Sequence, residues 1–302
     1  PWTAVAMVKM KFKNQQQQTK KFFDQEVYKW AEQSKRNENI FQNTIQQRNN
    51  FVNELVKEKK IKTHLDVGCG AGDLLDMTSP FVDLGIGIDF SSKMIEVAKK
   101  KFTKNKKVLL SNSSVFDFVF NKKIDFVSAN GFIEYLSIEE IKEFFLLVYK
   151  NLSKNGFFVF SSRNRLFNLF SLNKFSKLEL NENYFFKFYQ ESIDLMTLTF
   201  KKFIKKEPIN FSEVKYAQPK TYVNVDVRHQ FSPLQLLGIL KKFNFKIIDI
   251  SPINYHPVAP LIFSTNEEFK KISNVINYKL INKDDKIKLV PFSSTFMMVV
   301  KK

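Results

Sequence analysis

The chain has 302 residues, 44% of them hydrophobic and 15% aromatic, which is enough to bury at least one sizeable core. No apolar run approaches the roughly 20 residues that span a bilayer, and the first residues lack the order of a secretory signal. We therefore expect a cytoplasmic protein without a transmembrane segment.

The formal net charge of +18 would suit a nucleic-acid partner, because clustered cations neutralise phosphates. However, only five of the 48 basic residues are arginines, and the lysines are spread along the whole chain. Such a distribution does not define a dedicated binding face. We expect that nucleic acid is not the partner. Peripheral contact with a membrane is left open, as is the oligomeric state.

Residues 1–60 are predicted to form a flexible start followed by an N-terminal helical cap. A glutamine run covers residues 15–18. Between residues 20 and 60, apolar side chains recur at intervals near three and four, which is the pattern of amphipathic helices. We predict two or three helices in this region.

In residues 61–165, short apolar runs alternate with helical patterns, and this alternation predicts a parallel sheet with crossover helices on both faces. The expected strands cover residues 62–67, 84–89, 108–110, 124–129 and 157–161. Ser91 and Ser137 are expected helix caps, and Glu140 would complete a capping box with Ser137. Gly156 is expected to end the turn before the fifth strand.

Residues 166–227 interrupt the alternation. They contain no glycine and many aromatic side chains among lysines, which predicts a mostly helical insertion. Its aromatics either pack the insertion onto the core, or stack on bases or touch a membrane. The α/β pattern resumes in residues 228–302. There, Ser232 and Pro233 should open a helix over residues 234–243, and strands are expected at 245–250 and 295–300.

A glycine-rich turn follows the first expected strand. Gly68, Gly70 and Gly72 carry no Cβ, so their backbone can approach a ligand closely. The second strand ends in Asp89, where a carboxylate can accept hydrogen bonds from both hydroxyls of a ribose. In dinucleotide-binding loops the third glycine comes three residues after the second, whereas Gly72 comes two after Gly70. Asp66, at the end of the first strand, suits a cationic amino-acid group better than a pyrophosphate.

The segment His64–Gly72 resembles the first motif of class I S-adenosylmethionine-dependent methyltransferases. Gly87–Ser91 resembles their second-strand motif, and Ile124–Leu136 resembles their fourth-strand motif. The resemblance implies an α/β, Rossmann-like methyltransferase fold: a mostly parallel seven-stranded sheet with helices on both faces, an N-terminal helical cap and a helical insertion after the fifth strand. It also implies S-adenosylmethionine as the cofactor and S-adenosylhomocysteine as the product.

The same resemblance implies which residues bind the cofactor. Asp66 and the glycines would line the methionine end, Asp89 would hold the ribose and Phe90 would pack on the adenine. Asn130 would face the methyl donor. The full expected set is Asp66, Gly68, Cys69, Gly70, Gly72, Asp89, Phe90, Ser113, Ser114 and Asn130. Cys69, the single cysteine, is expected to fill space beside the cofactor and not to act as a nucleophile.

Within the family, the chain most resembles ubiquinone-biosynthesis O-methyltransferases and their relatives that act on small molecules. Glu134 matches a glutamate of their fourth-strand motif, and Tyr135 stands where they carry histidine. Asn164 and Arg165 match the segment after their fifth strand. The expected acceptor pocket comprises the catalytic candidates Tyr135, His229 and His256 and the substrate-binding candidates Glu134, Arg163, Arg165 and Tyr222.

Among these candidates, His229 is the first choice for a general base and His256 the second, because neutral imidazole can accept a proton at physiological pH. The rigid fork of Arg165 can grip two oxygens of an acidic acceptor. The structural alternatives are that Arg165 caps a helix and that His229 fixes a loop. His64, inside the first strand, is expected to be structural. No group of histidines and carboxylates has metal-ligand spacing, so no metal is expected.

Three functions stay open on the sequence. The first is methyl transfer to a small-molecule acceptor, at oxygen in preference to nitrogen. The second is methyl transfer to RNA or protein, which only the positive charge favours. The third is a non-catalytic binding module that keeps the fold. In the first case, residues 166–227 are expected to close over the acceptor as a lid.

Overall fold

The computed structural model describes residues 16–28, 44–180, 184–210, 228–260, 262 and 281–302. The chain divides into two compact units. The first unit comprises residues 1–36, 49–158 and 216–229, and the second comprises residues 37–48, 159–215 and 230–302. The domain boundaries expected at residues 61, 166 and 228 stay predictions.

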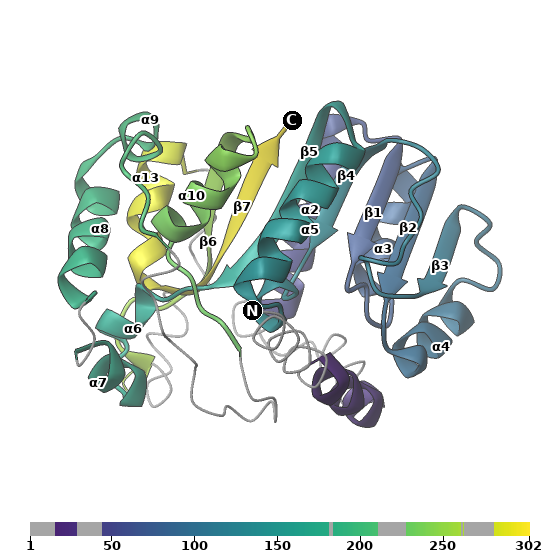
Figure 1. Cartoon of the computed structure of the whole chain (residues 1–302), viewed down its shortest axis with the longest axis horizontal. Helices are drawn as coiled ribbons and strands as arrows, with labels where there is room; N and C mark the ends of the chain where they lie inside the picture. Colours follow the sequence, from purple (N-terminus) through teal and green to yellow (C-terminus); the bar gives the residue numbers. More distant parts are fainter. Residues whose placement is uncertain (1–15, 29–43, 181–183, 211–227, 261, 263–280) are drawn as a thin grey trace, which may run out of the picture. The chain divides into compact units, whose positions relative to one another are not determined.

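Seven strands form one sheet in the order β3-β2-β1-β4-β5-β7-β6, as Figure 1 shows. β2 pairs with both β1 and β3 in parallel, β1 also pairs with β4 in parallel, and β6 and β7 are antiparallel. The expected α/β, mostly parallel Rossmann-like sheet is therefore confirmed. The strands are β1 Thr63–Val67, β2 Leu84–Asp89, β3 Val108–Asn112, β4 Ile124–Ala129, β5 Leu152–Arg163, β6 Lys246–Tyr255 and β7 Ser293–Lys301.

Helices lie between most of these strands, whereas the connection between β3 and β4 at residues 113–123 forms none. A helical segment covers residues 16–28 ahead of α2. The helices before β5 are α2 Thr44–Lys59, α3 Asp73–Thr78, α4 Ser92–Lys101 and α5 Ile138–Asn151, with short 3-10 turns η1 Ser79–Phe81 and η2 Ile133–Tyr135. After β5 come α6 Phe167–Phe170, α7 Lys174–Leu180, α8 Phe185–Thr197, α9 Phe200–Phe203, α10 Pro233–Lys242, α13 Lys283–Lys288 and η4 Val290–Phe292.

The helix starts follow the capping residues seen in the sequence. The Ser91 hydroxyl accepts the backbone N–H of Met94 at the start of α4. Ser137 and Glu140 form the predicted capping box of α5. At α10 the Ser232 cap and the proline at the first turn are both present. Each cap satisfies a backbone donor that a helix start leaves unpaired, which is why local sequence predicts these boundaries well.

The predicted start of the fifth strand is wrong. β5 begins at Leu152, five residues before the expected start at residue 157, and Gly156 lies inside the strand. The left-handed backbone is at Asn155, with φ of 68°. A Cβ on Gly156 would lie 3.0 Å from the Ser153 carbonyl oxygen and 3.1 Å from that of Asp125. The glycine is therefore needed for close backbone packing and not for a turn.

The core of the first unit contains a group of phenylalanine rings among its aliphatic side chains. The centroid of Phe158 lies 5.7 Å from that of Phe144 and 5.4 Å from that of Phe145, with the rings near perpendicular. Phe132 extends this group, 5.1 Å from Phe144. Such edge-to-face contacts stabilise the core beyond the effect of the apolar area that each ring buries. The group fixes η2 and the residues after β4 against α5.

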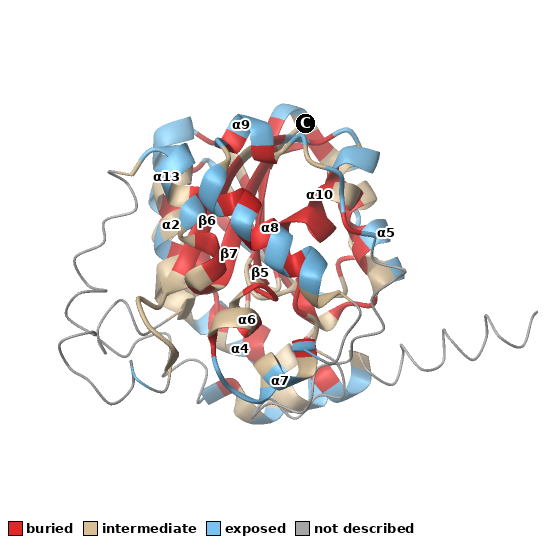
Figure 2. Ribbon diagram, turned by 90° about the vertical axis from the view of Figure 1, so that its left-hand side faces the viewer, coloured by how far each residue is buried: buried red, intermediate tan, exposed pale blue. Residues whose placement is uncertain are grey.

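The described part of the insertion is mostly helical, as predicted, and α8 is its longest helix. One face of α8 carries Phe188 and Leu195, which are fully buried in the second unit. The other face is open to solvent, and Phe186 there is 80% exposed; Figure 2 shows both faces. The aromatics therefore divide between packing, as in Phe188 and Phe203, and exposure. Residues 181–183 and 211–227 of the insertion lie outside the described residues.

Candidate cofactor and acceptor site

The glycine loop after β1 is held in place by backbone hydrogen bonds to β2. The N–H groups of Gly68 and Cys69 both donate to the Ile88 carbonyl oxygen, at 2.8 and 3.1 Å. Gly68, Gly70 and Gly72 have φ values of 71°, 53° and 79°, a region that side chains with a Cβ rarely adopt. Because β1 and β2 are parallel, the loop and the end of β2 lie at the same edge of the sheet.

Asp89 closes this loop from the end of β2. One carboxylate oxygen accepts the N–H of Gly70 at 2.9 Å, and the other accepts the N–H of Ser91 at 2.9 Å. A carboxylate has about four lone-pair positions, so acceptor capacity is left for ribose hydroxyls. Burial raises the pKa of Asp89 to about 6, against these two hydrogen bonds, and the nearby Asp24 raises it further. The carboxylate is therefore ionised at pH 7 and above.

Asp66 lies at the end of β1 and is buried. The Ser128 hydroxyl donates to its Oδ1 atom at 2.6 Å. Burial raises the pKa of Asp66 to about 7; the hydrogen bond from Ser128 lowers it, and the charges of Asp89 and Asp73 raise it. A cationic ligand beside Asp66 would stabilise the ionised carboxylate and lower its pKa.

Asn130, which follows β4, offers a second acceptor. Its side-chain N–H donates to the Asn49 side chain on α2 at 3.2 Å. Its side-chain oxygen is buried and has no hydrogen-bond partner within the part of the chain that the structure describes. A buried acceptor without a donor is costly, and a ligand ammonium would satisfy it. Asp66, Asn130 and the glycine loop therefore fit the amino-acid end of S-adenosylmethionine.

The residues expected beside the adenine lie around the ends of β2 and β3. The Ser113 N–H donates to the Asp89 carbonyl oxygen at 3.2 Å, and the Ser114 hydroxyl accepts the Phe116 N–H at 3.3 Å. Ser113, Ser114 and Phe90 are each half-buried. These positions are consistent with the expected adenine contacts, which stay a prediction.

Cys69 is packed inside the loop. A Cβ added to Gly87 would lie 2.9 Å from its sulfur, so the thiol fills the space that the glycine leaves. Burial raises the pKa of the Cys69 thiol well above its usual range, and the charges of Asp89 and Asp66 act in the same direction. A thiol that stays protonated is a poor nucleophile, which favours the space-filling role.

The helical segment at residues 16–28 packs on the glycine loop. Val27 forms a buried apolar cluster with Ala71 and Met94. Asp24 accepts a hydrogen bond from the Ser91 hydroxyl at 2.5 Å. Phe23 contacts Tyr135 edge-on, with ring centroids 5.5 Å apart. The segment was expected to belong to a helical cap, but none of its residues was expected in the site, because an amphipathic pattern does not say what its apolar face covers.

Tyr135, Glu134, Arg228 and His229 form one cluster in the first unit, which we call the acceptor cluster. Nε and Nη2 of Arg228 donate to Glu134 Oε1 at 3.0 and 2.6 Å. The same guanidinium lies over the Tyr135 ring, 5.5 Å from its centroid. Glu134 is almost fully buried, and its carboxylate pairs with Arg228. Its expected contact with the acceptor stays a prediction. Arg228 is not among the site residues expected from the sequence.

His229 is joined to this cluster through its backbone. Its N–H donates to the Glu134 carbonyl oxygen at 2.7 Å. Burial lowers the pKa of the imidazole to about 4, while the charge of Glu139 raises it. The ring is therefore neutral at physiological pH. It can accept a proton, but as a weaker base than an exposed histidine.

The structure favours a structural role for Arg165 over the expected acceptor-binding role. Its guanidinium donates from Nε and Nη2 to the Glu179 carboxylate at 3.0–3.1 Å, and both side chains are 0% exposed. It also lies over the Phe188 ring, 4.5 Å from the centroid. The carboxylate of α7 thus occupies the fork that we expected to hold an acidic substrate. Asn164 likewise donates to the Val290 and Ser293 carbonyl oxygens.

The other acceptor candidates belong to the second unit or lie outside the described residues. The His256 ring lies against Phe167, with centroids 4.9 Å apart and the ring planes tilted by 33°, and burial lowers the pKa of His256 to about 4. Arg163 is half-buried at the end of β5. Tyr222 lies outside the described residues. Convergence of these residues with Tyr135 and His229 stays a prediction.

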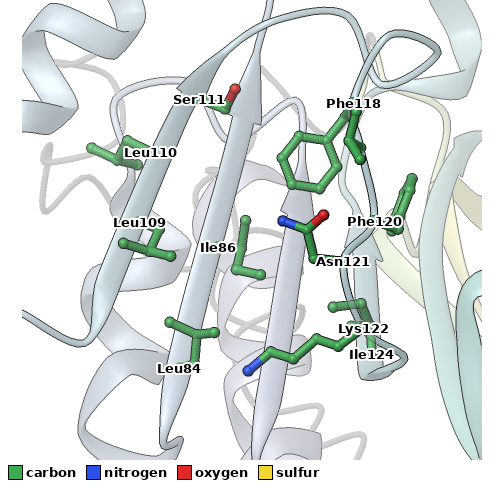
Figure 3. A pocket seen from close by; sticks show the side chains of 11 residues that line it. Leu84, Ile86, Leu109, Leu110, Ser111, Phe118, Phe120, Asn121, Lys122 and Ile124 are labelled. Atoms are coloured by element: carbon green, nitrogen blue, oxygen red, sulfur yellow. The ribbon is translucent and has the colours of Figure 1, made fainter.

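A separate apolar hollow lies along β2 and β3, and Figure 3 shows it from close by. Its volume is about 370 Å³. The hollow is lined by Leu84, Ile86, Leu109, Leu110, Ser111, Phe118, Val119, Phe120, Asn121, Lys122 and Ile124. The connection at residues 113–123 forms no helix, so this part of the sheet face stays open. None of the expected site residues lines it.

Two further findings apply to the described residues only. No group of three or more histidine, cysteine, aspartate or glutamate side chains is arranged to hold a metal ion there. Among the same residues, no helix is both long and apolar enough to cross a lipid bilayer.

The fold and the site define a class of protein. A parallel sheet presents a glycine loop, a ribose-type carboxylate and an acceptor pair for a cationic group at the ends of adjacent strands. That combination is an α/β protein that binds a nucleoside linked to an amino acid. Residues 65–156 match the model of a family described as "Methyltransferase domain". No protein of curated function matches this sequence.

Solved structures with a similar fold are also methyltransferases by name. An S-adenosylmethionine-dependent methyltransferase from Clostridium acetobutylicum aligns at 15% identity over 85% of this chain and 91% of its own, with a TM-score of 0.50. One from Mesorhizobium loti aligns at 13% identity over 83% and 96%, also at 0.50. The N-methyltransferase NodS from Bradyrhizobium japonicum, in complex with S-adenosyl-L-homocysteine, aligns at 17% identity over 43% of this chain and 65% of its own, at 0.38. The first two likenesses show the fold.

The matched domain and the geometry agree on the activity. The protein is an S-adenosylmethionine-dependent methyltransferase, and S-adenosylmethionine is its methyl donor. The matched residues run from β1 to β5 and include the glycine loop, Asp89, Asn130 and Tyr135. The acceptor and the subfamily are matters of proposal.

Proposed function

We propose that this enzyme methylates a hydroxyl oxygen of a small-molecule acceptor, as the resemblance to ubiquinone-biosynthesis O-methyltransferases implies. The observation that carries the proposal is the acceptor cluster, in which neutral His229 and cationic Arg228 are both tied to Glu134. The cluster lies near the glycine loop. Phe23 of the segment that packs on the loop contacts Tyr135, and the Phe132 ring lies 3.0 Å from the position of a Cβ on Gly68.

The chemistry of the cluster suits a hydroxyl better than an amine. The cofactor supplies an activated methyl group, so the protein must mainly position the acceptor and exclude water. A hydroxyl must also lose a proton, which neutral His229 can accept. Arg228 would stabilise negative charge that develops on the acceptor oxygen. A protonated amine would instead need a carboxylate, and the carboxylate of Glu134 is held by Arg228.

Residues of the first unit would bind the cofactor and position it beside the acceptor cluster. Asp89 would accept the ribose hydroxyls, while Asp66 and Asn130 would accept the ammonium of the amino-acid end. The segment at residues 16–28 would keep water from the loop, because its Val27 side chain is buried against Ala71. In-line transfer needs the acceptor oxygen within about 3–3.5 Å of the methyl carbon, and Tyr135 is the candidate to align the acceptor.

The test is methyl transfer from isotopically labelled S-adenosylmethionine to a panel of phenols, sugars, hydroxy acids and amines. We expect label on oxygen in at least one hydroxyl class. His229→Gln should then lower turnover by about 10²- to 10⁴-fold with little change in cofactor affinity. The same substitution in the second candidate base, His256→Gln, is the matched control. Label that enters only amines, RNA or protein would overturn the proposal, and so would unchanged turnover in His229→Gln.

A further inference from the structure

A buried chain of hydrogen bonds runs from α3 through β1 and β4 to the Asp66 carboxylate. The Thr78 hydroxyl lies 3.1 Å from the Leu74 carbonyl oxygen and 2.9 Å from His64 Nδ1. His64 Nε2 lies 2.8 Å from the Ser128 hydroxyl, which lies 2.6 Å from Asp66 Oδ1. Thr78, His64 and Ser128 are 0% exposed.

The strand register explains why these groups meet. His64 and Asp66 are two residues apart on β1, so their side chains point to the same face of the sheet. Ser128 on β4 is the Cα partner of Asp66, and Phe126 is the partner of His64. The Ser128 hydroxyl therefore stands between the imidazole and the carboxylate. The Phe126 ring meets the imidazole edge-on at 5.3 Å.

The number of protons on these side chains limits the directions that their hydrogen bonds can take. Each hydroxyl and the neutral imidazole carries a single proton, so the direction of one bond sets the next. When Asp66 is ionised, Ser128 donates to it and His64 must donate from Nε2 to Ser128. Thr78 then donates to Nδ1. When Asp66 is protonated on Oδ1, the bonds between the four side chains reverse: Asp66 donates to Ser128, Ser128 donates to Nε2, and His64 donates from Nδ1 to Thr78. The Thr78 hydroxyl then donates to the Leu74 carbonyl oxygen, which can only accept.

We propose that His64 is a positioning residue for the cofactor: its Nε2–H tautomer holds the Ser128 hydroxyl toward Asp66 and so keeps this carboxylate an acceptor for the cofactor's ammonium. The tautomer of His64 and the protonation of Asp66 change together. This inference rests on the proposed place of Asp66 at the amino-acid end of the cofactor. It adds His64 and Ser128, which do not touch the ligand, to the binding machinery.

Burial and neighbouring charges place the titration of Asp66 near neutral pH. Burial raises the pKa of Asp66 to about 7, with the Ser128 bond lowering it and the charges of Asp89 and Asp73 raising it. Burial also lowers the pKa of His64 to about 3, so the imidazole stays neutral while Asp66 titrates. A ligand that needs ionised Asp66 should bind more weakly as the pH falls below 7.

The first test reads the His64 tautomer directly in the protein without ligand, by nitrogen chemical shifts of imidazole-labelled protein. We expect the Nε2–H form at pH 8.5 and the Nδ1–H form at pH 5.5, with the same midpoint as Asp66. Addition of S-adenosylhomocysteine at pH 6 should restore the Nε2–H form. A single tautomer at both pH values, or a charged imidazolium, would overturn the coupling.

The second test measures binding of S-adenosylhomocysteine and of 5′-methylthioadenosine, which keeps the adenosine and lacks the amino-acid end. The ratio of the two affinities removes the titration of Asp89 at the ribose. For a group with a pKa near 7, the ratio should fall about tenfold between pH 8 and pH 6. A ratio independent of pH would overturn the role of Asp66, whatever the tautomer of His64.

Variants separate positioning from mere structure. Ser128→Ala and His64→Phe remove a donor that supports ionised Asp66, so the midpoint of the affinity ratio should move to higher pH. His64→Gln keeps an amide donor and should restore the wild-type midpoint. Weakening by one factor at every pH in Ser128→Ala and His64→Phe would show a structural role only and overturn the proposal. Ser128→Ala, the smaller change, keeps the test valid if His64→Phe does not fold.

Discussion

Replacing Asp89 should weaken binding of S-adenosylhomocysteine, because the carboxylate accepts a hydrogen bond from the glycine loop and is the expected acceptor for the ribose hydroxyls. In Asp89→Asn, one carboxylate oxygen becomes an amide NH2 group. If that group takes the place of Oδ2, it faces the Gly70 N–H donor, which now lies 2.9 Å from that oxygen. The ionised acceptor for the ribose hydroxyls is lost as well. A hydrogen bond to a charged group contributes about 1.5–3 kcal/mol, which corresponds to a roughly 10- to 150-fold loss of affinity.

The assay is calorimetric titration with S-adenosylhomocysteine at pH 8, where Asp89, with a pKa of about 6, is ionised. Asp76→Asn is the matched control, because Asp76 is an exposed acid on the neighbouring helix α3. We expect the control to bind like the wild type. An Asp89→Asn variant that is folded and binds with unchanged affinity would refute the assignment of this carboxylate to the ribose.

Three further outcomes follow from the contacts. Gly72→Ala should destabilise the fold and weaken S-adenosylhomocysteine binding, because φ is +79° and a Cβ would lie 2.7 Å from the Phe102 ring; thermal melting and calorimetry check this. Removing one partner of the Arg165–Glu179 pair, as in Glu179→Gln, should cost about 3–5 kcal/mol in urea unfolding, and a loss under 1 kcal/mol would contradict its burial. Asp66→Asn should raise the melting temperature of the ligand-free protein more at pH 8 than at pH 4. Burial raises the pKa of Asp66 in the folded protein from 3.8 to about 7, so ionised Asp66 lowers the free energy of unfolding progressively as the pH rises across that window. A gain in melting temperature that is independent of pH would contradict this raised pKa.

The sequence predicted those parts of the fold that local signals determine. β2 and β4 match their expected ranges, and the caps at Ser91 and Ser137 are present, because cap and strand patterns depend on neighbouring residues. The fifth strand was placed five residues late, because its glycine serves a packing contact with Asp125, far away in the sequence. Such a contact leaves no local pattern.

The candidate site divides in the same way. The loop glycines and Asp89 lie together, as the motif implied, because a motif records the geometry of one turn and its neighbouring strand. Arg228 was missed because its ion pair with Glu134 joins residues 94 apart in the chain. Arg165 was assigned to the acceptor because its partner on α7 could not be foreseen from composition.

The most direct test of the account is a crystal structure of the protein with S-adenosylhomocysteine. We predict that the ribose hydroxyls lie within hydrogen-bond distance of the Asp89 carboxylate and that the ammonium contacts Asp66 and the Asn130 side-chain oxygen. The sulfur should face the side of the loop on which Tyr135 lies. A ligand bound instead in the hollow along β2 and β3, or one that leaves Asp66 and Asp89 untouched, would contradict the account.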